Sequence, residues 1–167
     1  EPAGRSVLAC QYHIQSDLTV TIPPESRLFE HKILKHGIDV LKKIQPLGRL
    51  EHADAKEKIF GLAVDIGTTT VVAKLIDMTT GQCAATEAAV NPQVRYGDDV
   101  ISRIAYAQTD EKLLELHKVI IDCINKLTAK LCNTAAIAAK QVIQMCVVGN
   151  TTMNHIFLKL PIEQLGQ

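Results

Sequence analysis

The spacing of apolar residues changes along this chain and divides it into predicted strands and helices. Two short stretches near the beginning, at 6–12 and 17–22, have strand-like composition, and the second alternates apolar and polar residues. Residues 24–58 are mixed in pattern and rich in charge, with one short predicted helix at 38–44. We interpret this stretch as a linker.

A regular α/β pattern follows the linker. The run 59–66 is apolar except for Asp65, which predicts a strand buried on both faces. Further strands are predicted at 70–77 and 82–90, with a turn at 78–81 between them. Three sequential strands with short connections predict an antiparallel meander.

Helical spacing replaces the strand pattern after the third of these strands. A short helix is predicted at 98–107 and a longer one from 110 to about 139, with its apolar residues on one face. A strand at 144–148 and a helix from Thr151 to about 160 come next. A right-handed crossover would place this last strand beside the first one. The predicted fold class is therefore α/β.

The composition suits such a fold and excludes several functions. Hydrophobic residues make up 47% of the chain and aromatic ones 4%, which predicts a core of Ala, Val, Ile and Leu. Lys+Arg and Asp+Glu balance at 18 each, so no basic excess favours nucleic acid. Neither a membrane span nor a leader is recognisable, and we expect a cytoplasmic protein. The 5 cysteines form no C-x-x-C pair, which argues against a self-contained zinc site.

The strongest chemical motif lies at the end of the first apolar strand, where Asp65 is followed by Gly67, Thr68, Thr69 and Thr70. A carboxylate at such a place needs a partner, and metal ions or hydrogen-bond donors can provide it. The glycine allows a ligand to approach the backbone, and the amides and hydroxyls can hold phosphate oxygens. This predicts a cradle for phosphate and Mg²⁺. An ordinary β-hairpin capped by its own aspartate stays open as an alternative, because the motif is short.

A second candidate lies where the last predicted strand runs into a helix, through Gly149, Asn150, Thr151 and Thr152. Unpaired amides at a helix start favour anions, although a capped helix without a ligand has the same sequence pattern. His155 follows one turn later and is more typical of a structural histidine than of a base.

Two other segments have a distinctive composition. The polar stretch 91–104 is interpreted as the lining of a cleft or a surface for a partner, or as a loop with a helix cap at Asp98 or Asp99. Cys10 stands on a predicted strand in an L-A-C setting, which is similar to the fourth cluster ligand of plant-type [2Fe–2S] ferredoxins. A buried core cysteine is the alternative.

Together these motifs resemble the reductive activators of corrinoid proteins, which are ferredoxin-fused ATPases of the actin-like superfamily. The resemblance covers about residues 5–23 and 60–160 and rests on L-A-C at 8–10, D-L-T-V-T-I-P at 17–23, G-L-A-V-D-I-G-T-T-T-V-V at 61–72, N-P-Q-V-R-Y-G-D-D-V-I-S-R-I at 91–104 and V-V-G-N-T-T-M-N-H at 147–155. It implies the end of a ferredoxin module at 1–23, a linker at 24–58 and the first half of an actin-like, ribonuclease H-like ATPase domain at 59–167.

The resemblance also implies an activity. ATP would drive transfer of one electron from a [2Fe–2S] cluster to the Co(II) corrinoid of a methyltransferase partner, returning it to Co(I). Asp65 would hold Mg²⁺, Gly67 to Thr70 would hold the β- and γ-phosphates, Gly149 to Thr152 would close the phosphate site, and Cys10 would be a cluster ligand. An upstream electron donor is implied, and a homodimer is one possible assembly.

Two departures and two alternatives accompany this interpretation. The family commonly has a middle domain before the ATPase, whereas only about 36 residues separate Pro24 from Phe60 here. We also expect the chain to be a piece of a longer protein. This piece lacks the second lobe of the ATPase, and we therefore expect it to bind ATP weakly or not at all. A small-molecule kinase of the same superfamily and a non-catalytic electron-transfer or docking module are the alternative functions.

Overall fold

The computed structural model describes residues 58–166 and, nearer the N-terminus, positions 13, 15–17, 19 and 21. The chain divides into two compact units, Glu1–Lys32 and Ile33–Gln167, and the account below concerns the second. Cys10, the predicted strand at 6–12 and the predicted helix at 38–44 lie outside the described residues, and the predicted strand at 17–22 is described only at alternate positions.

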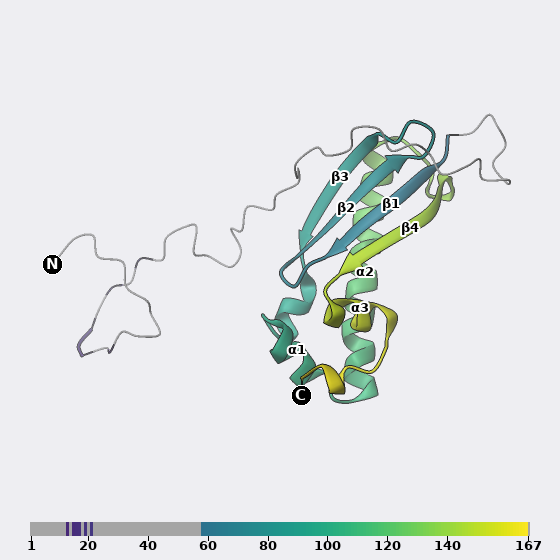
Figure 1. Cartoon of the computed structure of the whole chain (residues 1–167). Coiled ribbons are helices and arrows are strands. Elements are labelled where there is room, and N and C mark those ends of the chain that lie inside the picture. Colours follow the sequence, from purple (N-terminus) through teal and green to yellow (C-terminus); the bar gives the residue numbers. More distant parts are fainter. Residues whose placement is uncertain (1–12, 14, 18, 20, 22–57, 167) are drawn as a thin grey trace. The chain divides into compact units, whose positions relative to one another are not determined.

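One mixed sheet forms the centre of the described domain (Figure 1), with its strands in the order β3-β2-β1-β4. The strands are β1 (Phe60–Ile66), β2 (Thr70–Asp77), β3 (Cys83–Val90) and β4 (Val142–Gly149). β2 pairs antiparallel with both β1 and β3, and β4 pairs parallel with β1. The predicted meander and the predicted place of the last strand beside the first are both confirmed.

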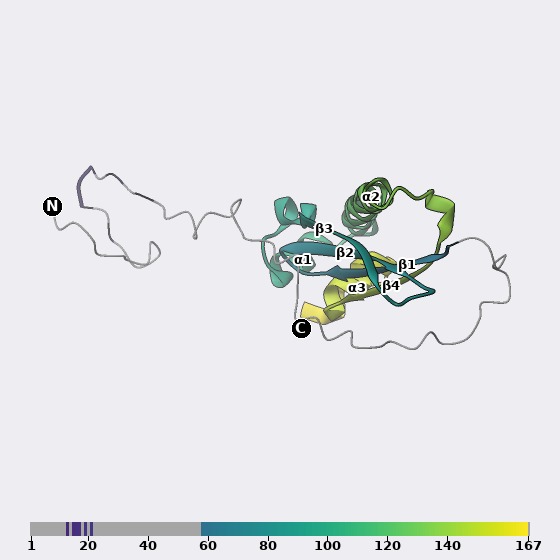
Figure 2. The same ribbon diagram turned by 90° about the horizontal axis from the view of Figure 1, so that it is seen from above.

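Helices cover one face of this sheet and its end. They are η3 (Pro92–Tyr96), α1 (Val100–Tyr106), α2 (Asp110–Thr134), η4 (Ala139–Gln141), α3 (Thr151–Leu158) and η5 (Glu163–Gly166). Seen from above, α2 lies along one side of the sheet (Figure 2). α1 and α3 lie beyond the end at which β1 and β4 finish (Figure 1). Among the described residues, no helix combines the length and apolar character needed to span a membrane.

The core is formed between α2 and the facing side of β1 and β2. Leu116 and Ile120 on α2 are fully buried, and so are Val71 and Leu75 on β2. The α2 stripe is Leu113, Leu116, Ile120, Cys123, Ile124, Leu127, Leu131 and Cys132. This is the apolar face that the helical spacing predicted.

α2 ends five residues before the predicted end at about 139. The N–H of Ala135 donates to Leu131 O at 2.9 Å and that of Ile137 to Cys132 O at 3.0 Å. Between them Ala136 has a φ of 52°, in the left-handed region. A left-handed residue after the last turn commonly ends a helix, and it is usually glycine. Because an alanine occupies the position here, the sequence does not mark the end of the helix.

β1 is buried along one face, whereas the other face runs from buried Gly61 through half-buried Ala63 to exposed Asp65, which corrects the prediction of a strand buried on both faces. Val64 and Ile66 are 2% and 1% exposed, whereas Asp65 between them is exposed. The neighbours of Asp65 across the sheet are Val72 and Val148, and Val148 is 54% exposed. The end of the strand that carries Asp65 is therefore open to solvent.

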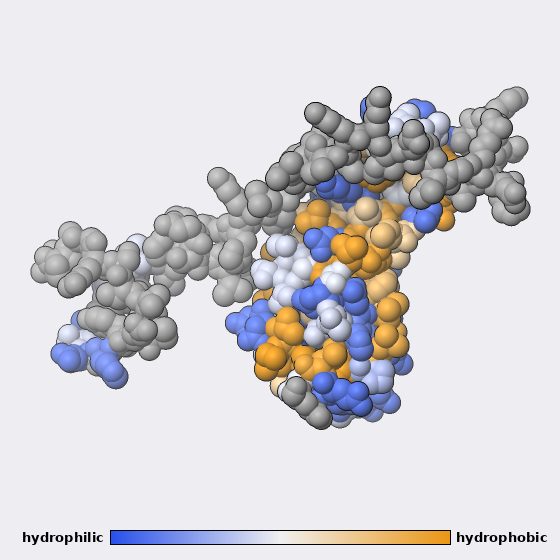
Figure 3. All heavy atoms as spheres, in the orientation of Figure 1, coloured by the Kyte–Doolittle hydropathy of each residue, from blue (hydrophilic) through white to orange (hydrophobic). Residues whose placement is uncertain are grey.

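Within the described residues, β4 is one of the two edge strands of the sheet, and three of its apolar side chains are exposed. Ile143, Met145 and Val148 are 46%, 47% and 54% exposed. In the space-filling view, hydrophobic residues gather on the β4 side of the domain (Figure 3). A hollow of about 360 Å³ lies beside Met145, between β4, α2 and Phe157. Its lining is largely apolar, and it does not include the turns that follow β1 and β4.

Replacing Leu116 by alanine tests the importance of the α2 stripe. Leu116 is fully buried, so Leu116→Ala should reduce the free energy of unfolding of this domain by about 2–5 kcal/mol. Urea unfolding followed by hydrogen exchange of amides in β1 and α2 measures the effect on this domain alone. The control is Lys118→Ala, an exposed position on the same helix, where the change should stay within about 0.5 kcal/mol. Equal effects of the two substitutions would contradict the assigned core.

Candidate functional site

The two sequence-predicted turns meet at one end of the sheet. In the parallel pair of β1 and β4, Asp65 lies opposite Val148 and Ile66 opposite Gly149, so both strands end together. The side-chain amide of Asn150 donates to Thr68 Oγ1 at 3.1 Å and joins the turn 67–70 to the turn 149–152. The carboxyl ends of parallel strands are where ligands bind in α/β sheets.

The turn after β1 is tight. Gly67 N–H donates to Thr70 O at 2.9 Å. A Cβ on residue 67 would lie 2.7 Å from that same oxygen, so a larger residue would force the backbone apart. In the described part of the chain, the N–H groups of Thr68 and Thr69 have no protein acceptor. Unpaired amides in a tight turn form a concavity suited to anions.

The turn after β4 leads directly into α3. Asn150 is the N-cap, and its Oδ1 accepts from Met153 N–H at 2.9 Å. A Cβ on Gly149 would lie 3.0 Å from Ile66 O, which keeps the two strand ends close together. Thr151 is exposed and Thr152 is 5% exposed. The predicted capped helix start is confirmed, and the remaining amides of its first turn are available to an anion.

Asp65 lies at this end of the sheet on the face opposite α2, with its carboxylate exposed. The described residues hold no cluster of three or more His, Cys, Asp or Glu side chains. A lone carboxylate does not exclude Mg²⁺, because Mg²⁺ is commonly held by one or two carboxylates together with waters and substrate phosphates. The available donors are therefore compatible with a magnesium–phosphate complex.

Three polar side chains of the segment 91–104 are inside the protein, whereas Asp98, Asp99 and Ile101 are exposed, so the predicted cleft lining or partner surface stays a prediction. Asn91, Gln93 and Arg103 are 0%, 1% and 0% exposed. Asn91 Nδ2 donates to Gly67 O at 2.8 Å and Asn91 N–H donates to Thr69 O at 2.7 Å. Asn91 therefore binds the first turn from the protein interior, and Gln93 is hydrogen-bonded to Asn91.

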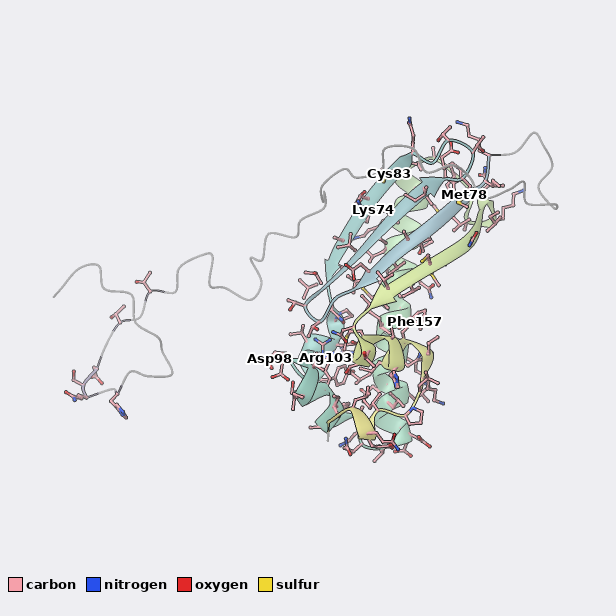
Figure 4. The ribbon with its side chains drawn as sticks, viewed as in Figure 1. Lys74, Met78, Cys83, Asp98, Arg103 and Phe157 are labelled. Atoms are coloured by element: carbon pink, nitrogen blue, oxygen red, sulfur yellow. The ribbon has the colours of Figure 1, made fainter. Side chains whose placement is uncertain are left out.

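Arg103 reaches from α1 toward the ends of the strands (Figure 4). Its Nε donates to Gly97 O at 2.8 Å, its Nη1 to Gln93 Oε1 at 3.3 Å and its Nη2 to Thr68 O. Burial lowers the pKa of Arg103, an effect that the nearby charges of Asp99 and Asp98 oppose. The guanidinium of an arginine stays protonated in proteins even when it is buried. A positive charge therefore lies next to the candidate phosphate turn.

The predicted helix cap is confirmed at Asp99. Its Oδ1 accepts from Ser102 N–H at 2.7 Å, and its own N–H donates to Ser102 Oγ at 3.3 Å, which forms a capping box. The bonds from Ser102 lower the pKa of Asp99. His155 Nδ1 lies 2.8 Å from Pro161 O, the contact of a structural histidine, as expected.

A tyrosine–glutamate cluster, which the sequence analysis missed, fixes this segment on α2. The Glu115 carboxylate accepts from Tyr96 at 2.9 Å and from Tyr106 at 2.6 Å. The two rings lie 5.0 Å apart, centre to centre. These hydrogen bonds lower the pKa of Glu115, and the bond to Glu115 raises the pKa of Tyr106 to about 12. No local motif signals the cluster, because its members lie on three different elements.

The fold and the paired turns define an α/β domain with a candidate anion site at the ends of adjacent parallel strands. The chain belongs to the RACo middle region family, whose model matches residues 60–167. This match corrects the expectation that the chain lacks the family's middle part, because the middle region is the part that begins at Phe60. The proposed boundaries at 23 and 58 stay predictions.

Known proteins similar to the chain are named for corrinoid activation. It is 40% identical over 116 residues to the corrinoid activation enzyme RamQ of Eubacterium limosum, covering 68% of this chain and 20% of RamQ. A solved structure of a reductive activator for corrinoid, iron-sulfur protein matches with a TM-score of 0.64 and 40% identity, over 66% of this chain and 18% of that one. The resemblance to reductive activators is confirmed, and the chain spans about a fifth of these relatives.

Titration of Tyr106 tests the cluster. Its pKa is raised from 10.0 to about 12, so its hydrogen bond stabilises the fold fully below pH 10 and is lost as the pH rises through 12. The phenolate absorbance difference between wild type and Tyr106→Phe should have a midpoint near 12. Glu115→Gln should lower that midpoint, whereas Glu111→Gln, an exposed position on the same helix, should leave it unchanged. A wild-type midpoint near 10 would be incompatible with the cluster.

Proposed function

We propose that the longest natural chain containing this sequence is an ATP-dependent activator that reduces a corrinoid protein from Co(II) to Co(I). The observation that carries the proposal is the junction of the two turns, where Asn150 donates to Thr68 at the paired ends of β1 and β4. Both turns present backbone amides and hydroxyls there, and Asp65 lies beside them. The names of the relatives, a corrinoid activation enzyme and a reductive activator for corrinoid, iron-sulfur protein, support the choice of substrate.

In this proposal, two groups of residues bind different parts of the triphosphate. Gly67, Thr68, Thr69 and Thr70 hold the β- and γ-phosphates, and Gly149, Asn150, Thr151 and Thr152 close the site from the neighbouring strand. Asp65 holds Mg²⁺ directly or through one of its waters, and the ion neutralises phosphate charge. Gly67 and Gly149 keep the two turns tight, because a Cβ would lie 2.7 Å from Thr70 O at the first position and 3.0 Å from Ile66 O at the second.

The electron would come from a [2Fe–2S] cluster to which Cys10 contributes one ligand, and a separate donor would reduce that cluster again. The cluster would supply one electron for each corrinoid that is reduced from Co(II) to Co(I). A ligand can drive an unfavourable transfer only by binding two conformational states with different affinity. ATP would bind more tightly to the state in which the turns 67–70 and 149–152 are closed around it, and this difference in affinity would drive the transfer.

Anaerobic reduction of a Co(II) corrinoid protein, followed by visible absorbance with and without Mg-ATP, tests this function. Wild type should form Co(I) only with Mg-ATP, and Asp65→Ala should lower the rate by about a hundredfold, as expected when a residue that stabilises developing charge is removed. Asp122→Ala removes an exposed carboxylate of α2, away from the turns, and should leave the rate unchanged.

One result would contradict the proposed activity, and another would contradict the proposed role of Asp65. If Co(I) never forms in wild type with Mg-ATP, the activity assignment fails. If Co(I) forms equally well in Asp65→Ala, the activity stands but Asp65 has no part in nucleotide use.

A further inference from the structure

Three consecutive carbonyl oxygens of the turn 67–70 accept hydrogen bonds from the distant segment 91–104. Gly67 O accepts from Asn91 Nδ2, Thr68 O from Arg103 Nη2 and Thr69 O from Asn91 N–H. The two donor residues lie 24 and 35 positions away from their acceptors along the chain. Both donor side chains are completely buried. We name this pair, Asn91 and Arg103, the carbonyl clamp.

Carbonyl oxygens carry partial negative charge and would repel a phosphate group. Because the carbonyl clamp binds these oxygens from the protein interior, it fixes the peptide planes of the turn. The N–H groups of Thr68 and Thr69 are on the same peptide units as two of them and have no acceptor in the described part of the chain. The direction of these donors therefore depends on the clamp, as in other preorganised anion sites.

The carbonyl clamp also contacts α3, the helix that begins at the turn 149–152. Arg103 Nη1 lies 3.3 Å from Met153 Sδ, and Asn91 Nδ2 lies 3.9 Å from the same sulfur. Met153 is in the first turn of α3 and is 1% exposed, and its N–H bonds the Asn150 cap. Asn150 in turn donates to Thr68 Oγ1. The guanidinium thus contacts the turn 67–70 through the Thr68 carbonyl. Through the buried side chain of Met153, it also contacts the helix that follows the turn 149–152.

We propose that Asn91 and Arg103 are positioning residues for the triphosphate: they hold the amides of the turn 67–70 toward the phosphates and keep the turn in register with α3. This inference rests on the proposed use of ATP. The planar fork of arginine is essential to it, because one side chain must reach Gly97, Gln93, Thr68 and Met153 at once. A lysine would retain the charge but not these directions.

Arg103→Lys in the longest natural chain containing this sequence is the test, with Asn91→Ala as the second variant. Two quantities are measured: hydrogen exchange of the peptide covering 67–70 without nucleotide, and the affinity for the non-hydrolysable analogue Mg-AMP-PNP. Each variant should speed exchange in that peptide and weaken binding of the analogue by about tenfold or more, because a partly buried carbonyl of the turn loses its hydrogen-bond donor. Leu127→Ala is the control, because Leu127 is buried on α2 and is 2% exposed. It lowers general stability but should leave both quantities unchanged.

The possible outcomes separate this inference from the function on which it rests. If wild type does not bind Mg-AMP-PNP, the proposed use of ATP fails and the role of the clamp toward phosphate fails with it. If wild type binds and Arg103→Lys binds equally well with unchanged exchange at 67–70, the inference alone is overturned. Equal losses in Leu127→Ala would also overturn it, because the effect would then reflect general stability.

Discussion

The buried guanidinium of Arg103 must find acceptors for its N–H groups, because a buried charge without partners is very costly. Its acceptors are two backbone carbonyls and an amide oxygen, from Gly97, Thr68 and Gln93, rather than carboxylates. Gln93 and Gly97 lie in η3 and at its end, and Thr68 lies in the first turn. The positions of the first turn, η3 and α1 are consequently fixed relative to one another, and movement of any of them would leave both a charge and a carbonyl unpaired.

Much of the fold could be predicted because its determinants are local. The stripe from Leu113 to Leu131 repeats with helical spacing, and each member is buried on α2 as expected. The short turns between β1, β2 and β3 permit only antiparallel neighbours. The place of β4 beside β1 followed from the right-handed crossover. The joining of Gly67 to Thr70 with Gly149 to Thr152 in one site was implied by the resemblance to reductive activators.

The features that were missed depend on contacts between distant residues. Arginine is rarely fully buried, so the sequence favoured an exposed place for Arg103. Its burial depends on Thr68, 35 positions away. The open face at Asp65 was missed for a related reason: a continuous apolar run does not say whether a second layer covers the strand. The end of α2 depends on a left-handed alanine at 136, for which the sequence has no signal.

The aspartate–glycine–threonine motif had two interpretations, a hairpin that caps itself and a turn that binds phosphate, and the surroundings of the turn favour the second. In a self-capped hairpin, the turn's carbonyls would face solvent and water could satisfy them without any buried donor. Here Asn91 and Arg103 are both 0% exposed, and each donates a side-chain hydrogen bond to one of those carbonyls. Burying an amide and a cation to fix the back of a turn costs desolvation energy. A site that must hold its amides rigidly toward an anion would account for that cost, whereas a simple connection between strands would not.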